Sequence, residues 1–253
     1  MIGNNIVSVY HGSNSIAAIK RGADTVFSKE TPIALSYITD GLVADFRGED
    51  DYVDGAWVDR VSGYKFTPVS ESTAPVHDAT NKLYEATQFG GMLADFTTGT
   101  TFSFEFVLRD VKNVVKSNSN NYAAIIGTNM SDYNMKNGVT VIKNKTSAYI
   151  YCHTWNESNS VEGGIPINEL TDGALDVISI IPNVGFFHNG VKFGDTGSTI
   201  TSGNIGLFTH YNGSYASSYR AKGKIHAVRK YTRALTAEEV LANYQTDVLI
   251  YGN

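Results

Sequence analysis

The sequence predicts an all-β protein in which two antiparallel sheets pack as a sandwich and a short helix follows the last strand. The chain of 253 residues contains 15 Tyr, 12 Phe, 24 Gly and only 5 Pro, a composition typical of strands joined by many turns. Apolar residues recur at every second position in many short segments, which is the period of a strand with two different faces. A clear helical pattern appears near the C-terminus. A chain of this length can bury roughly three quarters of its unfolded surface, which is enough for a substantial core.

The first thirty residues form a small unit of their own. Residues 7–16 and 17–26 align as two copies of a ten-residue pattern, with Gly12 in the position of Gly22. Each copy consists of a strand, a glycine-containing turn and a strand, so residues 1–30 are predicted to form a β-meander of three or four strands. A meander this small cannot bury enough surface to be stable alone. We therefore expect an attachment or assembly module, followed by a linker at residues 31–39, which contains Pro32, and by the sandwich at residues 40–253.

The clearest strand of the sandwich is Thr101 to Arg109. Four large apolar side chains share one face of it and are predicted to be core: Phe102, Phe104, Phe106 and Leu108. Glu105 lies on the opposite face, where we expect it at the surface in a salt bridge. Further strands are predicted at residues 121–128, 138–144, 146–155, 175–182, 185–193 and 204–211.

The last strand leads directly into the predicted helix. Ile225, Ala227, Arg229 and Tyr231 are predicted to share one face of this strand. Thr236 and Glu239 have the spacing of a capping box, in which each side chain accepts a hydrogen bond from the other residue's backbone N–H. The helix is expected to dock through an apolar side and to close one edge of the core. That apolar side is formed by Val240, Leu241 and Tyr244, and Leu235 supplies a hydrophobic staple with Val240.

Three segments resemble parts of one known fold. The run KIHAVRKYTRALTAEEVLANYQTD at residues 224–247 resembles the closing strand and helix of concanavalin A-like, LamG-type jelly-roll domains. DGLVADF at residues 40–46 resembles the opening strand of those domains, and GFFHNGVKF at residues 185–193 resembles their late hairpin, with an Asn-Gly turn at Asn189 and Gly190. The resemblance implies a concanavalin A-like jelly-roll sandwich and says more about fold than about activity.

The N-terminal pattern resembles the short N-terminal modules of bacteriophage tail and other virion proteins. This resemblance implies a virion protein that is made in the bacterial host cytoplasm, binds other virion proteins through its N-terminal meander and forms a homo-oligomer.

Composition excludes several classes of partner and covalent feature. A net charge of −5 and the absence of Lys/Arg runs argue against a nucleic-acid partner. Cys152 is the only cysteine, so no intrachain disulfide forms. No segment has the pattern of a signal peptide or the length of a membrane span, so we expect neither export by the usual route nor membrane insertion.

The carboxylates do not form a catalytic pattern. A concanavalin A-like glucanase carries its acid and nucleophile on alternate positions of one strand, in a Glu-x-Asp-x-x-Glu sequence that is missing here. The nearest match, Glu49 to Asp54, has the composition of a solvated loop. We therefore expect no enzyme activity and no cofactor. Calcium is possible in the same stretch, with Asp50, Asp51 and Asp54 as weak candidate ligands beside Glu49 and Asp59.

Two aromatic groups are candidate glycan-binding residues. Tyr149, Tyr151, His153 and Trp155 occupy every second position of one strand, where their rings either stack on sugars or fill the core. The loop from Thr209 to Arg220 has the Tyr, Ser, Gly and Asn composition of antibody contact loops, and it is either a contact loop or an ordinary connection. Its candidate residues are His210, Tyr211, Asn212 and Tyr215.

These features together predict a non-enzymatic, lectin-like virion module that binds host-surface polysaccharide. The alternative is a purely architectural virion protein whose sandwich contacts only other subunits, and a glycan hydrolase is less favoured.

Overall fold

The computed structural model describes residues 18–21, 24–28, 36–116, 122–128, 130–131, 134–135, 138–144, 149–155, 160–197, 202–209 and 220–252. The chain divides into two compact units, Met1–Leu35 and Ser36–Asn253, and each is considered by itself. None of the helices in the described part of the chain is long and apolar enough to cross a membrane.

The N-terminal unit contains one described pair of strands. β1 (Ala18–Arg21) and β2 (Asp24–Ser28) are antiparallel, with Ala18 opposite Ser28. This pair coincides with the second copy of the ten-residue repeat. The first copy, residues 7–16, lies outside the described residues.

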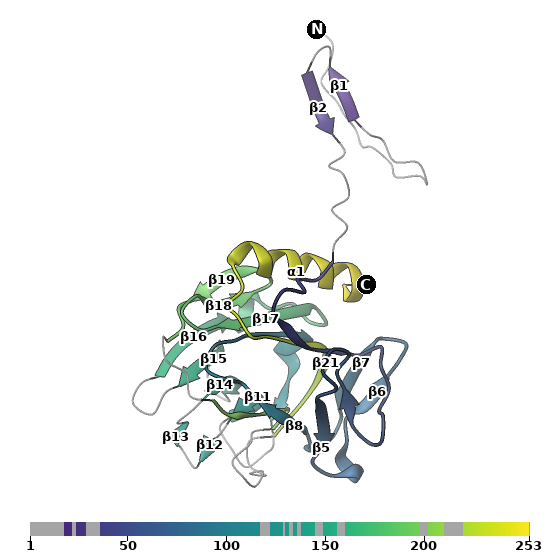
Figure 1. Ribbon diagram of the computed structural model, residues 1–253, viewed down its shortest axis with the longest axis vertical. Helices are drawn as coiled ribbons and strands as arrows, with labels where there is room; N and C mark the ends of the chain where they lie inside the picture. The colour runs from purple at the N-terminus through teal and green to yellow at the C-terminus, as the bar shows by residue number, and fades with distance from the viewer. Residues whose placement is uncertain are drawn as a thin grey trace. The chain divides into compact units, whose positions relative to one another are not determined.

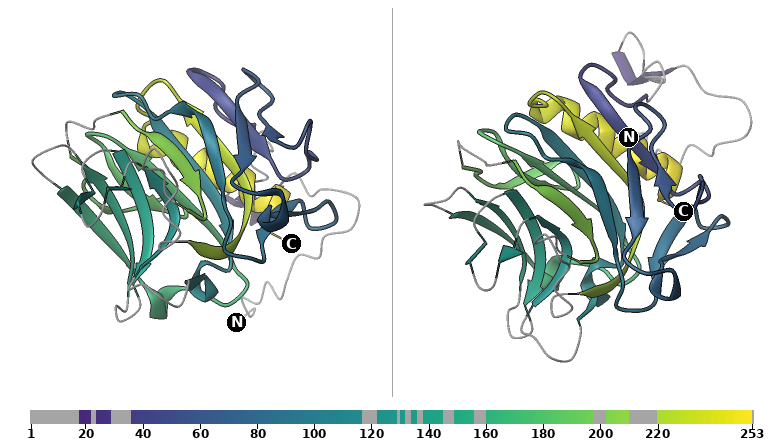
Figure 2. Two further views of the ribbon diagram at one scale, coloured as in Figure 1. Left: turned by 90° about the horizontal axis from the view of Figure 1, so that it is seen from below. Right: turned by 60° about the horizontal axis from the view of Figure 1, so that its bottom comes forward.

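The second unit is a sandwich of two antiparallel sheets, as predicted from the sequence (Figures 1 and 2). Among the described residues, one sheet has nine strands and the other has eight. The nine-stranded sheet has the order β19 (Val191–Gly194), β18 (Gly185–His188), β17 (Leu175–Ile181), β9 (Ser103–Arg109), β21 (Ala221–Tyr231), β7 (Leu83–Ala86) and β6 (Val76–Asp78), with β3 (Leu42–Arg47) and β10 (Val115–Lys116) also paired to β21. The eight-stranded sheet has the order β16 (Ser160–Pro166), β15 (Tyr149–Trp155), β14 (Gly138–Asn144), β11 (Tyr122–Thr128), β20 (Asn204–Leu207), β8 (Met92–Thr97), β5 (Lys65–Pro68) and β4 (Trp57–Val58).

Short elements connect these strands. β12 (Met130–Ser131) pairs with β13 (Asn134–Met135). Three single 3₁₀ turns are η1 (Glu71–Thr73), η2 (Val111–Asn113) and η3 (Ile167–Glu169). The turn between β18 and β19 is the predicted Asn-Gly turn, in which Asn189 and Gly190 have φ values of 53° and 79°, the left-handed conformation that such a hairpin turn requires.

The core lies between the two sheets. Phe102, Phe104, Phe106 and Leu108 are all buried there, so the predicted core face of β9 is confirmed. An aromatic cluster fills one end, where the ring of Phe46 lies 4.6 Å from that of Phe66 and 5.3 Å from that of Trp57. Such tilted and edge-on ring pairs add to the stability that burial provides.

A β-bulge in β21 changes the predicted faces of the last strand. Ile225 pairs with Leu108 and Ala227 with Val107, so His226 is the extra residue. Because one inserted residue reverses the alternation, Val228 joins Ile225 in the core between the sheets, whereas Ala227 lies in a separate cluster. The prediction that Ile225 and Ala227 share a face is therefore wrong.

The helix α1 (Ala237–Tyr251) begins with the predicted capping box. The Thr236 hydroxyl accepts from the Glu239 backbone N–H at 3.3 Å, and the Glu239 carboxylate accepts from the Thr236 N–H at 2.9 Å. Leu235 and Val240 are buried in one cluster, as the predicted staple requires.

The docking face of α1 differs from the prediction. The helix lies on the outer side of the nine-stranded sheet rather than at an edge of the core (Figure 2). Its buried residues are Val240, Asn243, Thr246, Asp247 and Tyr251, whereas Leu241 is 41% exposed. The interface thus combines apolar clusters around Val240 and Tyr251 with a polar contact between Asp247 and Arg229, which the bulge turns outward beneath the helix.

A buried ionic cluster joins α1 to the sheet. Arg229 donates to the Glu105 carboxylate at 2.9 Å and binds the Asp247 carboxylate through both terminal nitrogens, one of them at 2.9 Å. All three side chains are fully buried. Glu105 is thus salt-bridged as predicted but not at the surface, because α1 covers it. Burial raises the pKa of the Glu105 carboxyl, while Arg229 opposes that rise.

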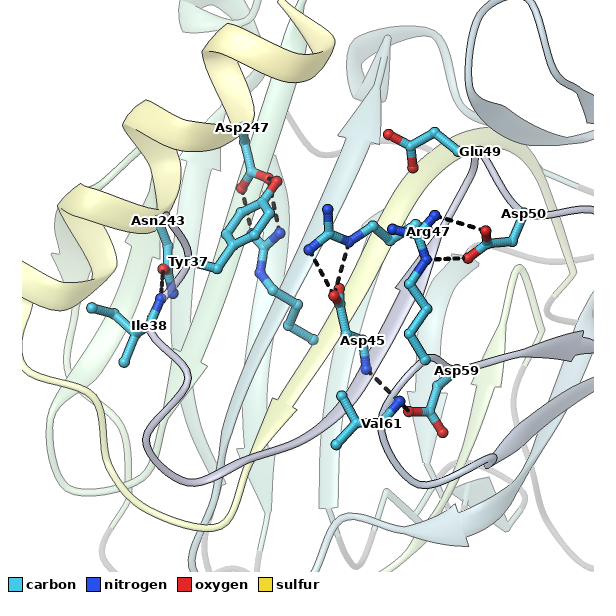
Figure 3. A network of polar contacts seen from close by, with 12 residues as sticks. Tyr37, Ile38, Asp45, Arg47, Glu49, Asp50, Asp59, Val61, Asn243 and Asp247 are labelled. Atoms are coloured by element: carbon cyan, nitrogen blue, oxygen red, sulfur yellow. Dashed lines mark hydrogen bonds and ion pairs between the residues drawn. The ribbon is translucent and has the colours of Figure 1, made fainter. Parts of the chain in front are cut away.

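Residues just before β3 belong to the sandwich as well. The Tyr37 hydroxyl donates to Asp247 at 2.7 Å, and the Ile38 backbone N–H donates to the Asn243 side chain at 2.9 Å (Figure 3). The Arg229 guanidinium lies 4.1 Å from the centre of the Tyr37 ring, which is a favourable cation–π distance. The C-terminal part of the expected linker at residues 31–39 is therefore packed against α1.

Candidate functional site

The strand β15 presents its aromatic residues on the outer face of the eight-stranded sheet. Ile150 and Cys152, which alternate with the rings, are buried in the core between the sheets. Successive side chains of a strand point to opposite faces. Tyr149, Tyr151 and His153 therefore face away from this core and do not fill it.

The three described rings form a row that becomes more buried along the strand. The ring centres of Tyr149 and Tyr151 are 5.9 Å apart, as are those of Tyr151 and His153. Tyr149 is 41% exposed, Tyr151 is half-buried and His153 is 7% exposed. A ring as buried as His153 offers little surface to a sugar, so the accessible part of the row is the tyrosine pair.

Burial also keeps the imidazole of His153 uncharged. It lowers the pKa of this imidazole to about 4, since removal from water disfavours the charged form. Among the described carboxylates, that of Glu162 lies 3.7 Å away on the neighbouring strand β16 and is largely exposed. His153 is therefore neutral at pH 7, and its ring packs beside that of Tyr151.

A glycine on β16 makes room for the exposed tyrosine. Gly164 lies opposite Tyr151, and a Cβ built on Gly164 would come within 3.0 Å of the Tyr149 ring. The side chain of Tyr149 therefore packs closely against Gly164. Sequence reasoning missed this residue because residues 160–166 were not predicted to form a strand, and a glycine signals a close approach only where a strand is expected.

The remaining residues predicted for this site are outside the described side chains. Trp155 continues β15 and pairs with Gly138 and Ser160 through its backbone, but its side chain is outside the described part. His210, Tyr211, Asn212 and Tyr215 are also outside it. Their loop follows β20, which belongs to the same sheet as β15 and is separated from it by β14 and β11.

The acidic stretch at residues 49–59 does not converge on one point. Asp59 accepts backbone N–H groups of Val61 at 2.7 Å and Ser62 at 3.0 Å, and so stabilises a turn. Asp50 forms a two-point contact with Arg60, at 2.6 and 2.7 Å. In Figure 3, Asp50 and Asp59 are joined to different partners. Glu49 accepts from the Tyr251 hydroxyl at 3.3 Å instead.

Two other carboxylates of this stretch also lie apart. Asp51 lies 3.3 Å from His77, and Asp54 occupies a turn with φ of 50°. Within the described part of the chain, no three His, Cys, Asp or Glu side chains are placed to hold a metal ion. The structure therefore does not bring Asp50, Asp51 and Asp54 together as calcium ligands.

Solved structures with a similar fold include proteins with sugar ligands. Trypanosoma rangeli sialidase in complex with the inhibitor DANA aligns with a TM-score of 0.57 and 10% identity, over 91% of this chain and 35% of the sialidase chain. The same sialidase in complex with sialic acid gives a TM-score of 0.55 and 12% identity, over 94% of this chain and 37% of that one.

A second group of similar structures comes from a bacterial toxin. The ligand-binding domain of botulinum neurotoxin serotype D, in complex with N-acetylneuraminic acid, aligns with a TM-score of 0.57 and 14% identity, over 83% of this chain and 52% of the domain chain. This chain thus corresponds to only part of each of these proteins. No protein-family model and no curated protein matches the sequence. At such low identities the likeness establishes the all-β sandwich fold.

Proposed function

We propose that this chain is a non-enzymatic, glycan-binding module of a bacteriophage virion, attached to other virion proteins through residues 1–30. The observation that carries the glycan-binding part is the tyrosine pair of β15, which faces outward from a strand whose alternate residues are core. Tyrosine rings are flat and amphipathic, so they stack on the C–H faces of sugars while their hydroxyls stay in water. The ligand is polysaccharide on the surface of the host cell.

The similar structures support this proposal because two of them hold sialic acid or N-acetylneuraminic acid. They support glycan binding by this fold and leave the sugar and the binding surface of this chain open. The phage assignment rests on the resemblance of the N-terminal pattern alone.

The carboxylates of the acidic stretch favour a binding role over hydrolysis. Two-carboxylate hydrolysis needs two groups about 5 to 10 Å apart across a sugar-binding cleft. The residues that match this pattern most nearly have separate surroundings: Glu49 accepts from the Tyr251 hydroxyl, Asp51 lies 3.3 Å from His77, and Asp54 lies in a turn. This separation supports a binding role.

Each single site is expected to bind weakly. Stacking on one exposed ring contributes on the order of 1 kcal/mol, whereas a millimolar dissociation constant needs about 4 kcal/mol. A site with two rings and a few hydroxyl contacts is therefore expected to bind in the millimolar range at best. Several copies that engage one surface together raise the effective affinity by orders of magnitude. The proposed function therefore includes a homo-oligomer, in which many weak sites act at once.

The test is a glycan array and retention on immobilised host polysaccharide with the full-length protein. Tyr149→Ala and Tyr151→Ala are expected to reduce retention, whereas Tyr149→Phe keeps the ring and serves as the matched control. Gly164→Ala is expected to displace the Tyr149 ring and so to reduce retention, although Tyr149 itself is not substituted. The outer placement of the rings predicts little change in melting temperature for the tyrosine variants.

A contrasting result would support the architectural alternative. If no glycan binds and Tyr149→Ala instead disrupts the oligomer, the ring row is a contact between subunits. Trp155→Ala and Tyr211→Ala extend the same measurement to the predicted residues outside the described side chains.

A further inference from the structure

A cluster of charged residues lies on the outer face of the nine-stranded sheet, beside the C-terminal end of α1. Glu85 of β7, Lys224 of β21 and Arg109 of β9 are cross-strand neighbours in one row. Two pockets with volumes of about 310 and 370 Å³ share these three residues in their walls. Pockets of this size accommodate small ligands such as a sugar ring. We call this region the basic groove.

Arg109 is held in the groove by uncharged acceptors. Its Nε donates to His226 at 2.9 Å, its Nη1 donates to the Gly173 carbonyl at 3.1 Å, and its Nη2 donates to the Tyr251 carbonyl. None of these partners is a carboxylate, and no described carboxylate forms an ion pair with Arg109. A guanidinium has five N–H donors, so two remain for a ligand.

His226, the side-chain partner of Arg109, is held in one orientation and carries no charge. His226 is 1% exposed, and its Nδ1 lies 2.8 Å from the Lys82 carbonyl oxygen. Nδ1 must carry the proton to donate to that carbonyl, which leaves Nε2 as an acceptor for Arg109. Burial lowers the pKa of His226 to about 4, so this arrangement persists at pH 7. The bulge in β21 thus aims a buried imidazole at the guanidinium and orients it.

Further cations line the groove without carboxylate partners. Lys82 and Lys222 lie in its walls, and neither forms an ion pair with any described carboxylate. The Lys222 ammonium instead lies 4.9 Å from the centre of the Phe89 ring. These cations stand out in a chain whose net charge is −5.

The acidic residues of the groove are already engaged. Asp78 accepts from Asn81 at 2.7 and 3.0 Å, and Asp110 accepts from Asn113 and from the Gly173 N–H, each at 2.8 Å. Glu85 lies 3.8 Å from Lys224, and both of these side chains are more than a third exposed. The carboxylates therefore stabilise turns or pair weakly, while Arg109 keeps an unneutralised charge.

We propose that the basic groove binds a carboxylate-bearing sugar, such as a uronic acid residue of an acidic polysaccharide. Arg109 binds the sugar carboxylate with its remaining donors, since a guanidinium fork matches the two oxygens of a carboxylate. Lys82 and Lys222 lie on either side of it and attract the charge, and the amide groups of Asn81 and Asn113 provide partners for hydroxyls. This site is on a different sheet from the tyrosine pair and does not depend on it.

The test is an NMR titration of the ¹⁵N-labelled full-length protein with sodium D-glucuronate. We expect saturable shifts of the Arg109 Nε–H signal and of the Gly223 and Lys224 amides. Methyl D-glucoside, the neutral probe, is expected to leave these signals in place. Equal shifts with the glucoside would overturn the proposal, and tighter binding of D-glucose 6-phosphate than of glucuronate would overturn the assignment of a carboxylate.

Charge variants identify the groove as the site. Lys82→Gln and Lys222→Gln are each expected to weaken glucuronate binding about threefold, the usual scale for one exposed charge contact. Arg109→Lys is expected to weaken it at least as much, because the charge remains and the fork is lost. Lys192→Gln, which removes an exposed cation on β19 outside the groove, is the matched control.

Unchanged binding in both lysine variants would refute the proposal. They test it even if changes at Arg109 unfold the protein, because neither Lys82 nor Lys222 is ion-paired with a carboxylate in the described part of the chain.

Discussion

Replacing Arg229 with methionine tests whether the buried ionic cluster holds α1 on the sandwich. The change removes the cation between Glu105 and Asp247 and leaves two carboxylates in a site from which water is excluded. Breaking a buried pair by removing one partner typically costs about 3 to 5 kcal/mol. For a folded unit of this size, such a loss lowers the melting temperature by roughly 6 to 20 °C.

The measurement is urea unfolding of the full-length protein at pH 7, followed by circular dichroism. Lys192→Met is the control, because its ion pair with Asp195 at 2.8 Å is solvent-exposed and is worth less than about 1 kcal/mol. Arg229→Met/Asp247→Asn is expected to recover part of the stability, since only one carboxylate is then left without a counter-charge. A loss below about 1 kcal/mol for Arg229→Met would refute the reasoning.

The stability of Arg229→Met is also expected to depend on pH. Without Arg229, the cation that opposes the effect of burial is gone, so the folded-state pKa of the Glu105 carboxyl rises further above its unfolded value. The folded protein then binds more protons than the unfolded chain, so its stability improves as the pH falls. The difference between Arg229→Met and the unmodified protein is therefore expected to shrink from pH 7 toward pH 4.

Three further predictions follow from the fold. Thr236→Ala is expected to cost about 1 kcal/mol, the usual value of a lost helix cap, and an unchanged unfolding midpoint would contradict it. His153 and His226 have pKa values lowered to about 4 by burial, so the unfolded chain takes up protons first as the pH falls below 6.5. Each histidine therefore contributes up to about 3 kcal/mol to the free energy of unfolding above pH 6.5. This contribution is lost as the pH falls toward 4. Urea unfolding at pH 7.5, 5.5 and 4 checks this, and a stability that increases over that range would contradict it. A chain that begins at Ser36 is expected to stay folded but to fail to join its particle or oligomer, and normal assembly would refute a role of the N-terminal meander.

Local rules in the sequence determined much of the sandwich. The alternating phenylalanines of β9 indicated its core face, because a strand exposes successive side chains to opposite sides. Thr236 and Glu239 gave the start of the helix, and Asn189-Gly190 gave the hairpin turn, since both patterns depend on residues only a few positions apart. Tyr149, Tyr151 and His153 of β15 were correctly grouped on one face for the same reason.

The tertiary structure decided which face of each strand is buried and which residues cover it. Arg229 meets Glu105 from 124 residues away, and the bulge at His226 that turns Arg229 beneath α1 has no signature in the strand's own alternation. Equally, both faces of β15 carry residues suited to burial, so the position of Ile150 and Cys152 in the core had to come from the packing of the two sheets. Periodicity specifies that a strand has two faces, whereas the contacts that cover each face come from distant parts of the chain.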